Sequence, residues 1–157
     1  MDIVDFKRIA EDVECPTRGS FDAAGWDLYA WTYENHQTSE NDNWMVMIPP
    51  WSTIKIRTGI CMSIPKGCFG GIYARSGLAT KKGLAPANKV GIIDADYRGE
   101  IMVVLYNQSS VPVEIRKNDR IAQLIIQPYV TVVMDEVDTL DETKRGDGGF
   151  GSTGMNI

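Results

Sequence analysis

Histidine is almost absent from this sequence of 157 residues, in which His36 is the only one. A Ser-His-Asp hydrolase needs a histidine as its general base, and a histidine-rich metal site needs several as ligands. His36 lies in the polar stretch of residues 33–43, which is typical of an exposed loop. We therefore expect His36 to be a solvated loop residue, and any catalytic base to be a different side chain.

Cysteines and long apolar runs are also scarce. Cys15, Cys61 and Cys68 are odd in number, widely spaced and without histidines at ligand spacing, which indicates reduced thiols in an intracellular protein. No apolar run is long enough to cross a bilayer, and the first residues lack the basic and apolar regions of a signal peptide. We expect a cytoplasmic protein, or one in the nucleus of a host cell, with no membrane partner.

Positive charge is in deficit as well, because 16 Lys and Arg residues face 21 Asp and Glu residues, for a net charge of −5. This balance argues against sequence-independent binding of nucleic acid. It also opposes an anionic substrate, so a site for one would need local basic groups and a metal ion. The length and the 43% hydrophobic content are ordinary for one folded domain with a core.

The dominant local pattern is that of β-strands. Residues 53–60 alternate apolar and polar side chains, and residues 101–106, 111–115 and 129–133 are short runs rich in β-branched residues. Gly, Pro, Asn and Asp separate these runs, and no helical repeat lies between them. The pattern predicts an all-β sandwich or barrel.

One short helix is expected directly after Arg75. Ser76 would cap it, the helix would continue to Lys82, and Gly83 would end it. The polar residues 34–43 are expected to form an exposed loop or hairpin tip.

Two segments carry more chemistry than a fold requires. Residues 91–100 read Gly-Ile-Ile-Asp-Ala-Asp-Tyr-Arg-Gly-Glu, where the plain alternative is a charged β-turn. Residues 145–154 combine five glycines with an arginine, a phenylalanine and two hydroxyl side chains, as a phosphate-closing segment would. The plain alternative, a disordered glycine-rich tail, leaves the single Phe150 unexplained.

Five segments in order resemble the five motifs of the trimeric dUTPase family. They are residues 24–28 (Ala-Gly-Trp-Asp-Leu), 75–79 (Arg-Ser-Gly-Leu-Ala), 91–100, 119–124 (Asp-Arg-Ile-Ala-Gln-Leu) and 145–154. One such motif alone would be weak evidence for the family, whereas five in the same order cover nearly the whole chain. The resemblance implies a jelly-roll-like β-fold and a homotrimer with active sites shared between subunits. It also implies Mg²⁺-dependent hydrolysis of dUTP to dUMP and pyrophosphate, which lowers dUTP and supplies dUMP for thymidylate synthesis.

The same resemblance assigns the nucleoside-binding residues. Asp94 matches the carboxylate that orients and activates the attacking water, and Tyr97 matches the ring that lies against the deoxyribose and excludes a 2′-hydroxyl group. The positions that match the uracil-binding part are Asn88, Gly91, Ile92, Ile93, Met102 and the stacking Phe150.

The phosphate-binding residues follow in the same way. The matching positions are Arg75, Ser76, Gly77 and Gln123 in the body, and Arg145, Gly151, Ser152 and Thr153 in the tail. Asp27 matches a carboxylate that lies near Mg²⁺ through water, the metal being held mainly by the triphosphate. The chain would then divide into a β domain, residues 1–137, and an acidic linker with a mobile glycine-rich tail, residues 138–157, that closes over the site.

The sequence departs from the family pattern in a few places. Ala74 stands where a proline is usual, Asn118 where a glycine is common, and Trp26 is bulkier than usual at a packing position. Residues 33–47 are longer than the usual connection, and Trp44 and Trp51 near it suggest a small surface hairpin. This insertion is either a tolerated loop or a binding site for a partner.

Three other functions are compatible with parts of the sequence. A dCTP deaminase would share the fold but needs a different carboxylate base and a more strongly charged second motif. A non-catalytic interaction protein would be expected to lack Asp94, Tyr97, Gln123 or Phe150, and all four are present. A generic β-sandwich binding module would not explain the composition of residues 145–154.

Overall fold

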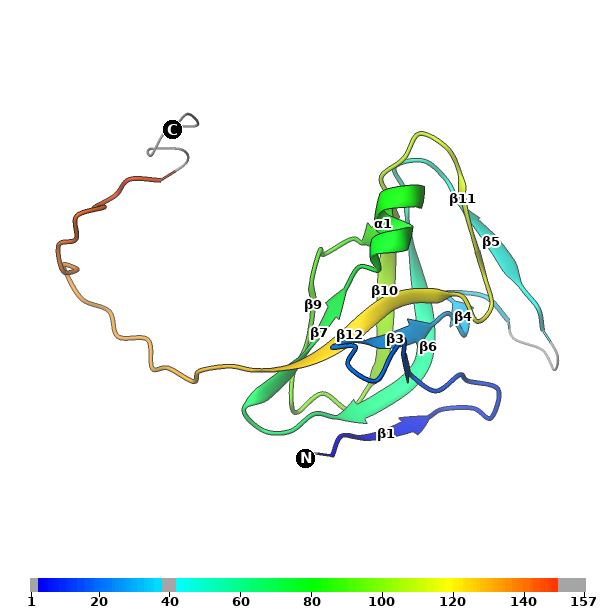
Figure 1. Cartoon of the computed structure of the whole chain (residues 1–157), viewed down its shortest axis with the longest axis horizontal. Coiled ribbons are helices and arrows are strands. Elements are labelled where there is room, and N and C mark those ends of the chain that lie inside the picture. The colour runs from blue at the N-terminus through cyan, green and yellow to red at the C-terminus, as the bar shows by residue number, and fades with distance from the viewer. Residues whose placement is uncertain (1–2, 38–41, 150–157) are drawn as a thin grey trace.

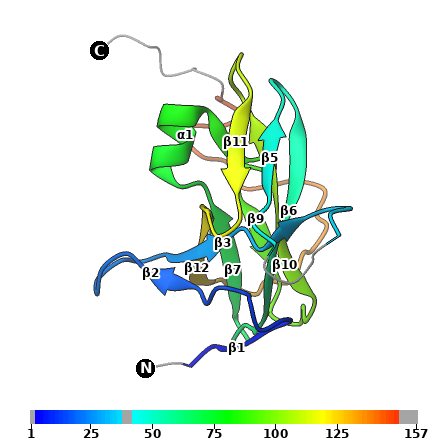
Figure 2. The same ribbon diagram turned by 90° about the vertical axis from the view of Figure 1, so that its right-hand side faces the viewer.

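The computed structural model describes residues 3–37 and 42–149, and the described part is built mostly of strands (Figure 1). One sheet has the order β1-β6-β10-β8, with β4 also on β6, and the other has the order β2-β3-β12-β7-β9. β5 and β11 form a separate two-stranded ribbon and lie side by side in Figure 2. Strands that are neighbours in a sheet are mostly distant in sequence, as in a jelly roll. The expected all-β fold with one short helix is confirmed.

The elements have the following bounds. The first sheet contains β1 (Asp5–Arg8), β4 (Thr32–Tyr33), β6 (Thr53–Ser63), β8 (Leu84–Pro86) and β10 (Glu100–Asn107). The second contains β2 (Thr17–Arg18), β3 (Trp26–Tyr29), β7 (Cys68–Tyr73), β9 (Gly91–Ile93) and β12 (Arg120–Pro128). The ribbon is β5 (Met45–Ile48) with β11 (Val113–Arg116), and the helix is α1 (Ser76–Lys82).

The core lies between the two sheets. In β10, Ile101, Val103 and Leu105 are buried while Met102 and Val104 are exposed, which is the alternation of a half-buried strand. Ile56 of β6 and Leu124 of β12 belong to the same buried cluster. Each apolar face is therefore removed from water by the opposite sheet.

The predicted strands are recovered with one exception. Residues 53–60 lie in β6 and residues 101–106 in β10, while β11 begins at Val113, two residues later than predicted. Residues 129–133 were wrongly predicted as a strand, because the strand there is β12 and it ends at Pro128. Val130 is 84% and Val133 93% exposed. Their β-forming side chains have no sheet to pack on within the single chain.

The helix begins and ends near its predicted bounds, but its N-terminus differs. Ser76 is its first residue and not its cap, which was the prediction; Arg75 takes the cap position, without a side-chain hydrogen bond. The carbonyl of Arg75 accepts from the backbone N–H groups of Leu78 and Ala79. Gly83 ends the helix as expected, in the left-handed conformation at φ 65°.

The described parts of the 33–47 segment, residues 33–37 and 42–47, do not form the predicted surface hairpin. β4 pairs with β6 and β5 pairs with β11, so the two flanking strands do not pair with each other. Trp44 is only 6% exposed and its indole donates to the Trp31 carbonyl at 2.8 Å, whereas Trp51 is 63% exposed. The prediction was wrong because Trp44 packs in the core, whereas Trp51 stays exposed.

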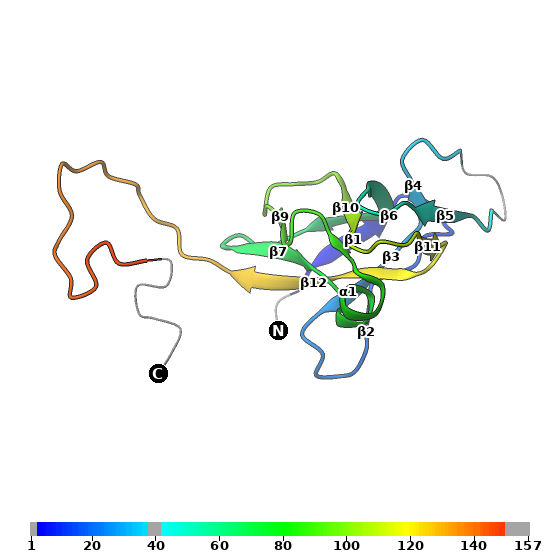
Figure 3. The same cartoon turned by 90° about the horizontal axis from the view of Figure 1, so that it is seen from above.

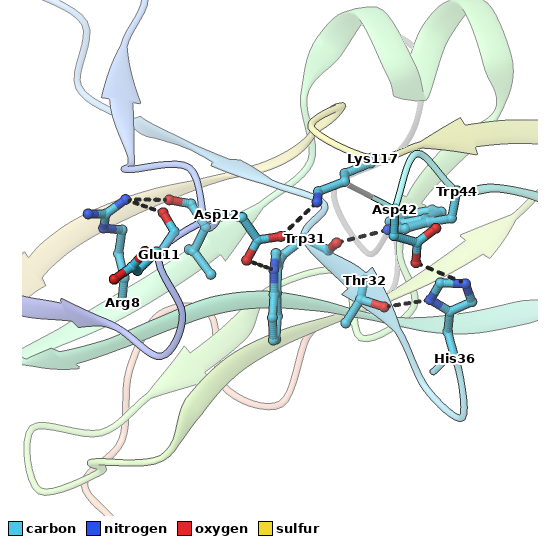
Figure 4. Close-up of polar contacts among 10 residues, drawn as sticks. Arg8, Glu11, Asp12, Trp31, Thr32, His36, Asp42, Trp44 and Lys117 are labelled. Atoms are coloured by element: carbon cyan, nitrogen blue, oxygen red, sulfur yellow. Dashed lines mark hydrogen bonds and ion pairs between the residues drawn. The ribbon is translucent and has the colours of Figure 1, made fainter. Parts of the chain in front are cut away.

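His36 is also not the solvated residue that was predicted. Its Nδ1 lies 3.1 Å from the Thr32 hydroxyl and its Nε2 lies 3.5 Å from Asp42 (Figure 4). The ring packs against Tyr33 with centroids 4.6 Å apart. His36 therefore links Thr32, just before the 33–47 segment, to Asp42 within it.

The chain leaves the body after β12. Residues 129–149 contain no helix or strand and extend away from both sheets (Figures 1 and 3). In the described ranges no helix has the length and apolar character needed to cross a membrane. The division into domains at residue 137 stays a prediction.

Candidate active site

A small cavity lies where β9 runs through a turn into β10. Its volume is about 190 Å³, and it is lined by Ile92, Ile93, Asp94, Tyr97, Glu100 and Met102. β9 is the last strand of its sheet, so within residues 3–37 and 42–149 no neighbouring strand uses the backbone N–H and C=O groups on its outer edge. The cavity thus combines an apolar wall, an exposed carboxylate and a row of backbone donors and acceptors.

The turn between β9 and β10 holds Tyr97 in one orientation. The Tyr97 N–H donates to the Asp94 carbonyl at 3.1 Å, and the Tyr97 hydroxyl donates to the Glu100 carbonyl at 3.0 Å. A Cβ at Gly99 would lie 2.5 Å from the Tyr97 hydroxyl oxygen, so the ring lies directly on this glycine. Asn88 is not in the cavity wall, and its amide lies next to Gly91 at the start of β9.

A second cluster lies at the start of α1, where Arg75 and Arg120 share one carboxylate. Arg75 Nε is 2.8 Å from one oxygen of Asp27, and Arg120 Nη1 is 3.1 Å from the other. Arg75 also donates to the Arg120 carbonyl at 3.2 Å. Gln123 donates to the Ala74 carbonyl at 2.9 Å, next to the same turn. The fold thus brings together Asp27, Arg75 and Gln123, three of the residues predicted for the site.

Arg120 was missed by the sequence analysis. The available signal was its place in residues 119–124, which resemble the fourth family motif. Its contact with Asp27 depends on the pairing of β12 with β3, in which Gln123 lies opposite Asp27. Ser76 and Gly77 begin the helix, so their backbone N–H groups precede the first intrahelical bonds and can face an anion.

The two clusters do not meet within one chain. Ile93, next to Asp94, pairs with Gly70 of β7, whereas Arg75 follows the other end of the same strand. The three strand positions from Gly70 to Tyr73 span roughly 10 Å at ~3.3 Å per residue, and Arg75 lies two residues beyond the end of the strand. The chain therefore contains a cavity half-site and a basic half-site at opposite ends of β7.

The predicted tail residues are only partly described. Arg145 donates from Nε to the Gly148 carbonyl at 2.8 Å, and among the described residues no hydrogen bond joins it to either half-site. The predicted positions Phe150, Gly151, Ser152 and Thr153 lie outside the described residues.

The residues near Asp27 do not form a cage for a metal ion. Asp27 is 8% exposed and both of its oxygens face arginines. Within residues 3–37 and 42–149 no group of three or more His, Cys, Asp or Glu side chains could hold a metal. This arrangement fits Mg²⁺ only as an ion that keeps most of its waters and is bound mainly by a ligand's phosphates.

The fold and its two half-sites define an all-β protein equipped for an anionic ligand with a flat, partly apolar end. The model of the dUTPase family matches residues 11–154, and the chain belongs to this family. The expected family is thereby confirmed.

Similar sequences come from animals, plants and viruses. The chain is 43% identical over 152 residues to the mitochondrial deoxyuridine 5'-triphosphate nucleotidohydrolase of Homo sapiens, covering 96% of this chain and 54% of that protein. It is 44% identical over 149 residues to the Arabidopsis thaliana protein of the same name, covering 95% and 81%. The corresponding protein of Paramecium bursaria Chlorella virus 1 is 42% identical over 149 residues, covering 95% and 96%. The chain thus spans about half of the human relative and nearly all of the viral one.

Solved structures with the same fold include phage enzymes. The Staphylococcus bacteriophage 80alpha dUTPase with dUpNHpp has a TM-score of 0.79 and 25% identity, covering 98% of this chain and 99% of that one. A variant dUTPase of phage phi11 of S. aureus is alike in fold, with a TM-score of 0.74, 21% identity and coverage of 90% and 100%. The structure of that variant reveals how a structural Mg(II) ion is coordinated.

Proposed function

We propose that this chain hydrolyses dUTP to dUMP and pyrophosphate with the help of Mg²⁺. Membership of the dUTPase family over residues 11–154 supports this reaction. The observation that carries the proposal is that Asp94 and Tyr97 line one small cavity beside the free edge of β9. A carboxylate, an aromatic ring and an ordered backbone edge are what base-specific hydrolysis without histidine requires.

The cavity binds the nucleoside in this proposal. Backbone groups of Gly91, Ile92 and Ile93 pair with the uracil edge, while the Asn88 amide supports the start of β9 at Gly91. A wrong base would leave buried polar groups unpaired, which discriminates strongly. The Tyr97 ring lies against the deoxyribose and leaves no space for a 2′-hydroxyl group, Met102 closes the apolar wall, and Phe150 of the tail stacks on the base.

The basic cluster binds the phosphates. Arg75 and the backbone N–H groups of Ser76 and Gly77 supply donors that suit phosphate oxygens, and Gln123 adds an amide. Arg120, which shares Asp27 with Arg75, belongs to the same cluster. The tail would complete the enclosure through Arg145, Gly151, Ser152 and Thr153. Closure excludes bulk water from the reaction.

Asp94 supplies the base. Its side chain is exposed in a rigid turn, so it can hold a water molecule and accept its proton as the oxygen attacks the α-phosphorus in line with the departing pyrophosphate. Mg²⁺ bound to the triphosphate would neutralise part of the charge that accumulates there. Asp27 would contact the waters of this ion, and the arginines stabilise charge on the leaving group.

A homotrimer with shared active sites explains two features of the single chain. The cavity and the basic cluster lie at opposite ends of β7, so different subunits would supply the two halves of one site. Residues 129–137 also expose an apolar surface that a neighbouring subunit would cover. Its members, with their exposed fractions, are Tyr129 50%, Val130 84%, Val132 66%, Val133 93%, Met134 90% and Val137 54%. The β domain would then span residues 1–137, and residues 138–157 would form the closing tail.

The proposed location is intracellular, either the cytoplasm or a host nucleus. Free cysteines at positions 15, 61 and 68 support a reducing compartment. The proposed partners are dUTP and other subunits of the same chain, and the net charge of −5 argues against nucleic acid or an acidic membrane as a partner.

The first experiment measures pyrophosphate release with Mg²⁺ from dUTP, dCTP, dTTP and UTP. Wild type is compared with Asp94→Asn and with Asp96→Asn, a control that removes an exposed carboxylate from the same turn. We expect turnover of dUTP alone, a fall of at least ~10³-fold in Asp94→Asn, and near wild-type activity in Asp96→Asn. Absence of pyrophosphate from all four nucleotides would refute the proposal, and release of ammonia from dCTP would favour a deaminase.

A further inference from the structure

The pairing of β6 with β10 is interrupted beside the nucleoside cavity. Glu100 lies opposite Cys61 and Met102 lies opposite Arg57, so two steps along β10 correspond to four along β6. The extra residues form a bulge around Gly59, whose φ is 71°. A Cβ at Gly59 would lie 2.3 Å from Val13 Cγ2, so only glycine fits this position.

The Glu100 side chain fills this bulge. One carboxylate oxygen accepts the Gly59 N–H at 2.8 Å, and the other accepts Arg57 Nε at 2.8 Å. Arg57 Nη2 is also 2.8 Å from that second oxygen, which makes the contact a charge-assisted pair with two donors. The Glu100 side chain is 12% exposed, so its polar contacts are made mostly with protein.

Arg57 is itself held in place from the opposite side. Its guanidinium group lies 5.0 Å from the ring centre of Trp31, and its carbonyl accepts the Trp31 N–H at 2.9 Å. The Trp31 indole donates to Asp12 at 3.0 Å, and Asp12 pairs with Lys117 at 2.7 Å (Figure 4). The hydrogen bond from Lys117, followed by the one from Trp31, lowers the pKa of Asp12 and keeps it charged. Arg57, the partner of Glu100, is therefore held by a chain of contacts that runs through Trp31 to Asp12 and Lys117.

The backbone of Glu100 meets the sugar-binding part of the cavity. The Glu100 carbonyl accepts the Tyr97 hydroxyl at 3.0 Å, so the residue held in the bulge also holds the phenol. The next carbonyl, that of Ile101, accepts the Thr58 hydroxyl at 2.6 Å, which fixes the same stretch of β10 to β6. Glu100 also lines the cavity, but its two carboxylate oxygens are already engaged by three donors. It is thus better suited to support Tyr97 than to bind a ligand itself.

We propose that Glu100 is a positioning residue that sets the sugar selectivity of the site: its carboxylate, clamped by Arg57 and the Gly59 N–H, fixes the carbonyl that orients Tyr97. This rests on the proposed function, because Tyr97 is the ring placed against the deoxyribose. If the clamp is lost, the ring gains freedom to move away from Gly99, and a ribose 2′-hydroxyl group can then be accommodated. Discrimination between deoxyribose and ribose is the property that Glu100 controls.

The test compares binding of dUMP and UMP by calorimetry in the full chain, alongside kcat and KM for dUTP and UTP. In Glu100→Ala we expect the dUMP preference over UMP to fall about 10-fold, with KM for dUTP rising more than kcat falls. Glu100→Gln keeps an acceptor for the Gly59 N–H and should recover part of the preference. Glu114→Ala, which removes another strand carboxylate paired with an arginine, should leave the preference unchanged.

A double variant separates positioning from general stability. Tyr97→Phe removes the hydroxyl that Glu100 orients, so adding Glu100→Ala to it should change the preference little further. Additive effects of the two substitutions would overturn the proposal, as would a wild-type preference in Glu100→Ala. If Glu100→Ala does not fold, Arg57→Met is used instead, because it removes two of the three donors to the Glu100 carboxylate. An unchanged preference for dUMP over UMP in Arg57→Met would also overturn the proposal. Loss of hydrolysis in the wild type with the dUMP preference intact would instead refute only the proposed reaction.

Discussion

At the scale of single residues, several glycines lie so close to neighbouring side chains that an added Cβ would force those side chains to shift. Gly99 gives the Tyr97 ring its place, and Gly59 lets β6 bulge around the Glu100 carboxylate. Gly25 does the same near the basic cluster, where a Cβ would lie 2.6 Å from Gln123 Oε1. At such positions a larger residue would clash with its neighbours. The available space therefore restricts the residue type as much as the chemistry of the site does.

Gly59 offers a direct test of this crowding. Gly59→Ala should lower the free energy of unfolding by about 2–4 kcal/mol, because it adds both a positive-φ strain and a clash with Val13. Gly67→Ala, with φ 83° but open space around its Cβ, should cost only about 1 kcal/mol. Denaturant unfolding measures all variants, with Gly19→Ala as the unstrained control. Equal losses at positions 59 and 67 would show that Val13 does not confine the bulge.

Some residues near the two clusters were predicted from the sequence, and others were not. Asp94 and Tyr97 were predicted in the site from the motif of residues 91–100, and Met102 from its position near that motif; all three line one cavity. Glu100 and Arg120 were missed, although both lie within recognised segments. Their contacts join residues 41 positions apart for Glu100 and Gly59, and 93 positions apart for Arg120 and Asp27. No local pattern reports a pairing at such separations.

At the scale of elements, the segment of residues 33–47 is part of the body at both ends. Trp44 is buried and bonded to the Trp31 carbonyl, and His36 bridges Thr32 and Asp42. The sequence marked this segment as an insertion but placed Trp44 and Trp51 on the surface together. Of the two tryptophans, only Trp51 is exposed at the surface. Burial of one of two similar tryptophans is decided by strand pairing, which composition does not report.

The two tryptophans make a matched pair for experiment. Trp44→Phe removes the buried indole bond and leaves the Trp31 carbonyl without this donor, so the free energy of unfolding should fall by about 1–3 kcal/mol. Trp51→Phe, at a side chain 63% exposed, should change it by less than about 0.5 kcal/mol. Thermal and denaturant unfolding followed by circular dichroism would measure both. Equal effects would contradict the anchoring role of Trp44.

At the scale of the whole molecule, two features of the chain bear on the proposed assembly. Its cavity and its basic cluster are separated along β7, and its apolar residues 129–137 have no cover. Both features are consistent with the proposed homotrimer, in which neighbours complete the site and bury the segment. An exposed apolar surface of this kind is costly in water unless a partner removes it.

Self-association should therefore depend on this segment. Val130→Asp combined with Val133→Asp places charges where a neighbour would pack, and we expect the trimer to give way to monomer in analytical ultracentrifugation. Activity towards dUTP should fall with the trimer, while the circular dichroism of the β domain is retained. Leu140→Asp, at an equally exposed apolar residue beyond position 137, is the control and should leave the assembly intact. A trimer that survives the double substitution would place the interface elsewhere.

The sequence by itself determined the all-β class, the short helix ending at Gly83, and the residue types of the proposed site, which contains no histidine. These properties are carried by short windows: alternation in residues 53–60, turn residues, and motifs that keep their spacing. Only the tertiary structure decided that Arg75 and Arg120 share Asp27, that Glu100 is clamped inside a bulge of β6, and that the two half-sites lie apart. Those facts depend on the register of strands distant in the chain, and register is set by the packing of the whole core rather than by any local pattern.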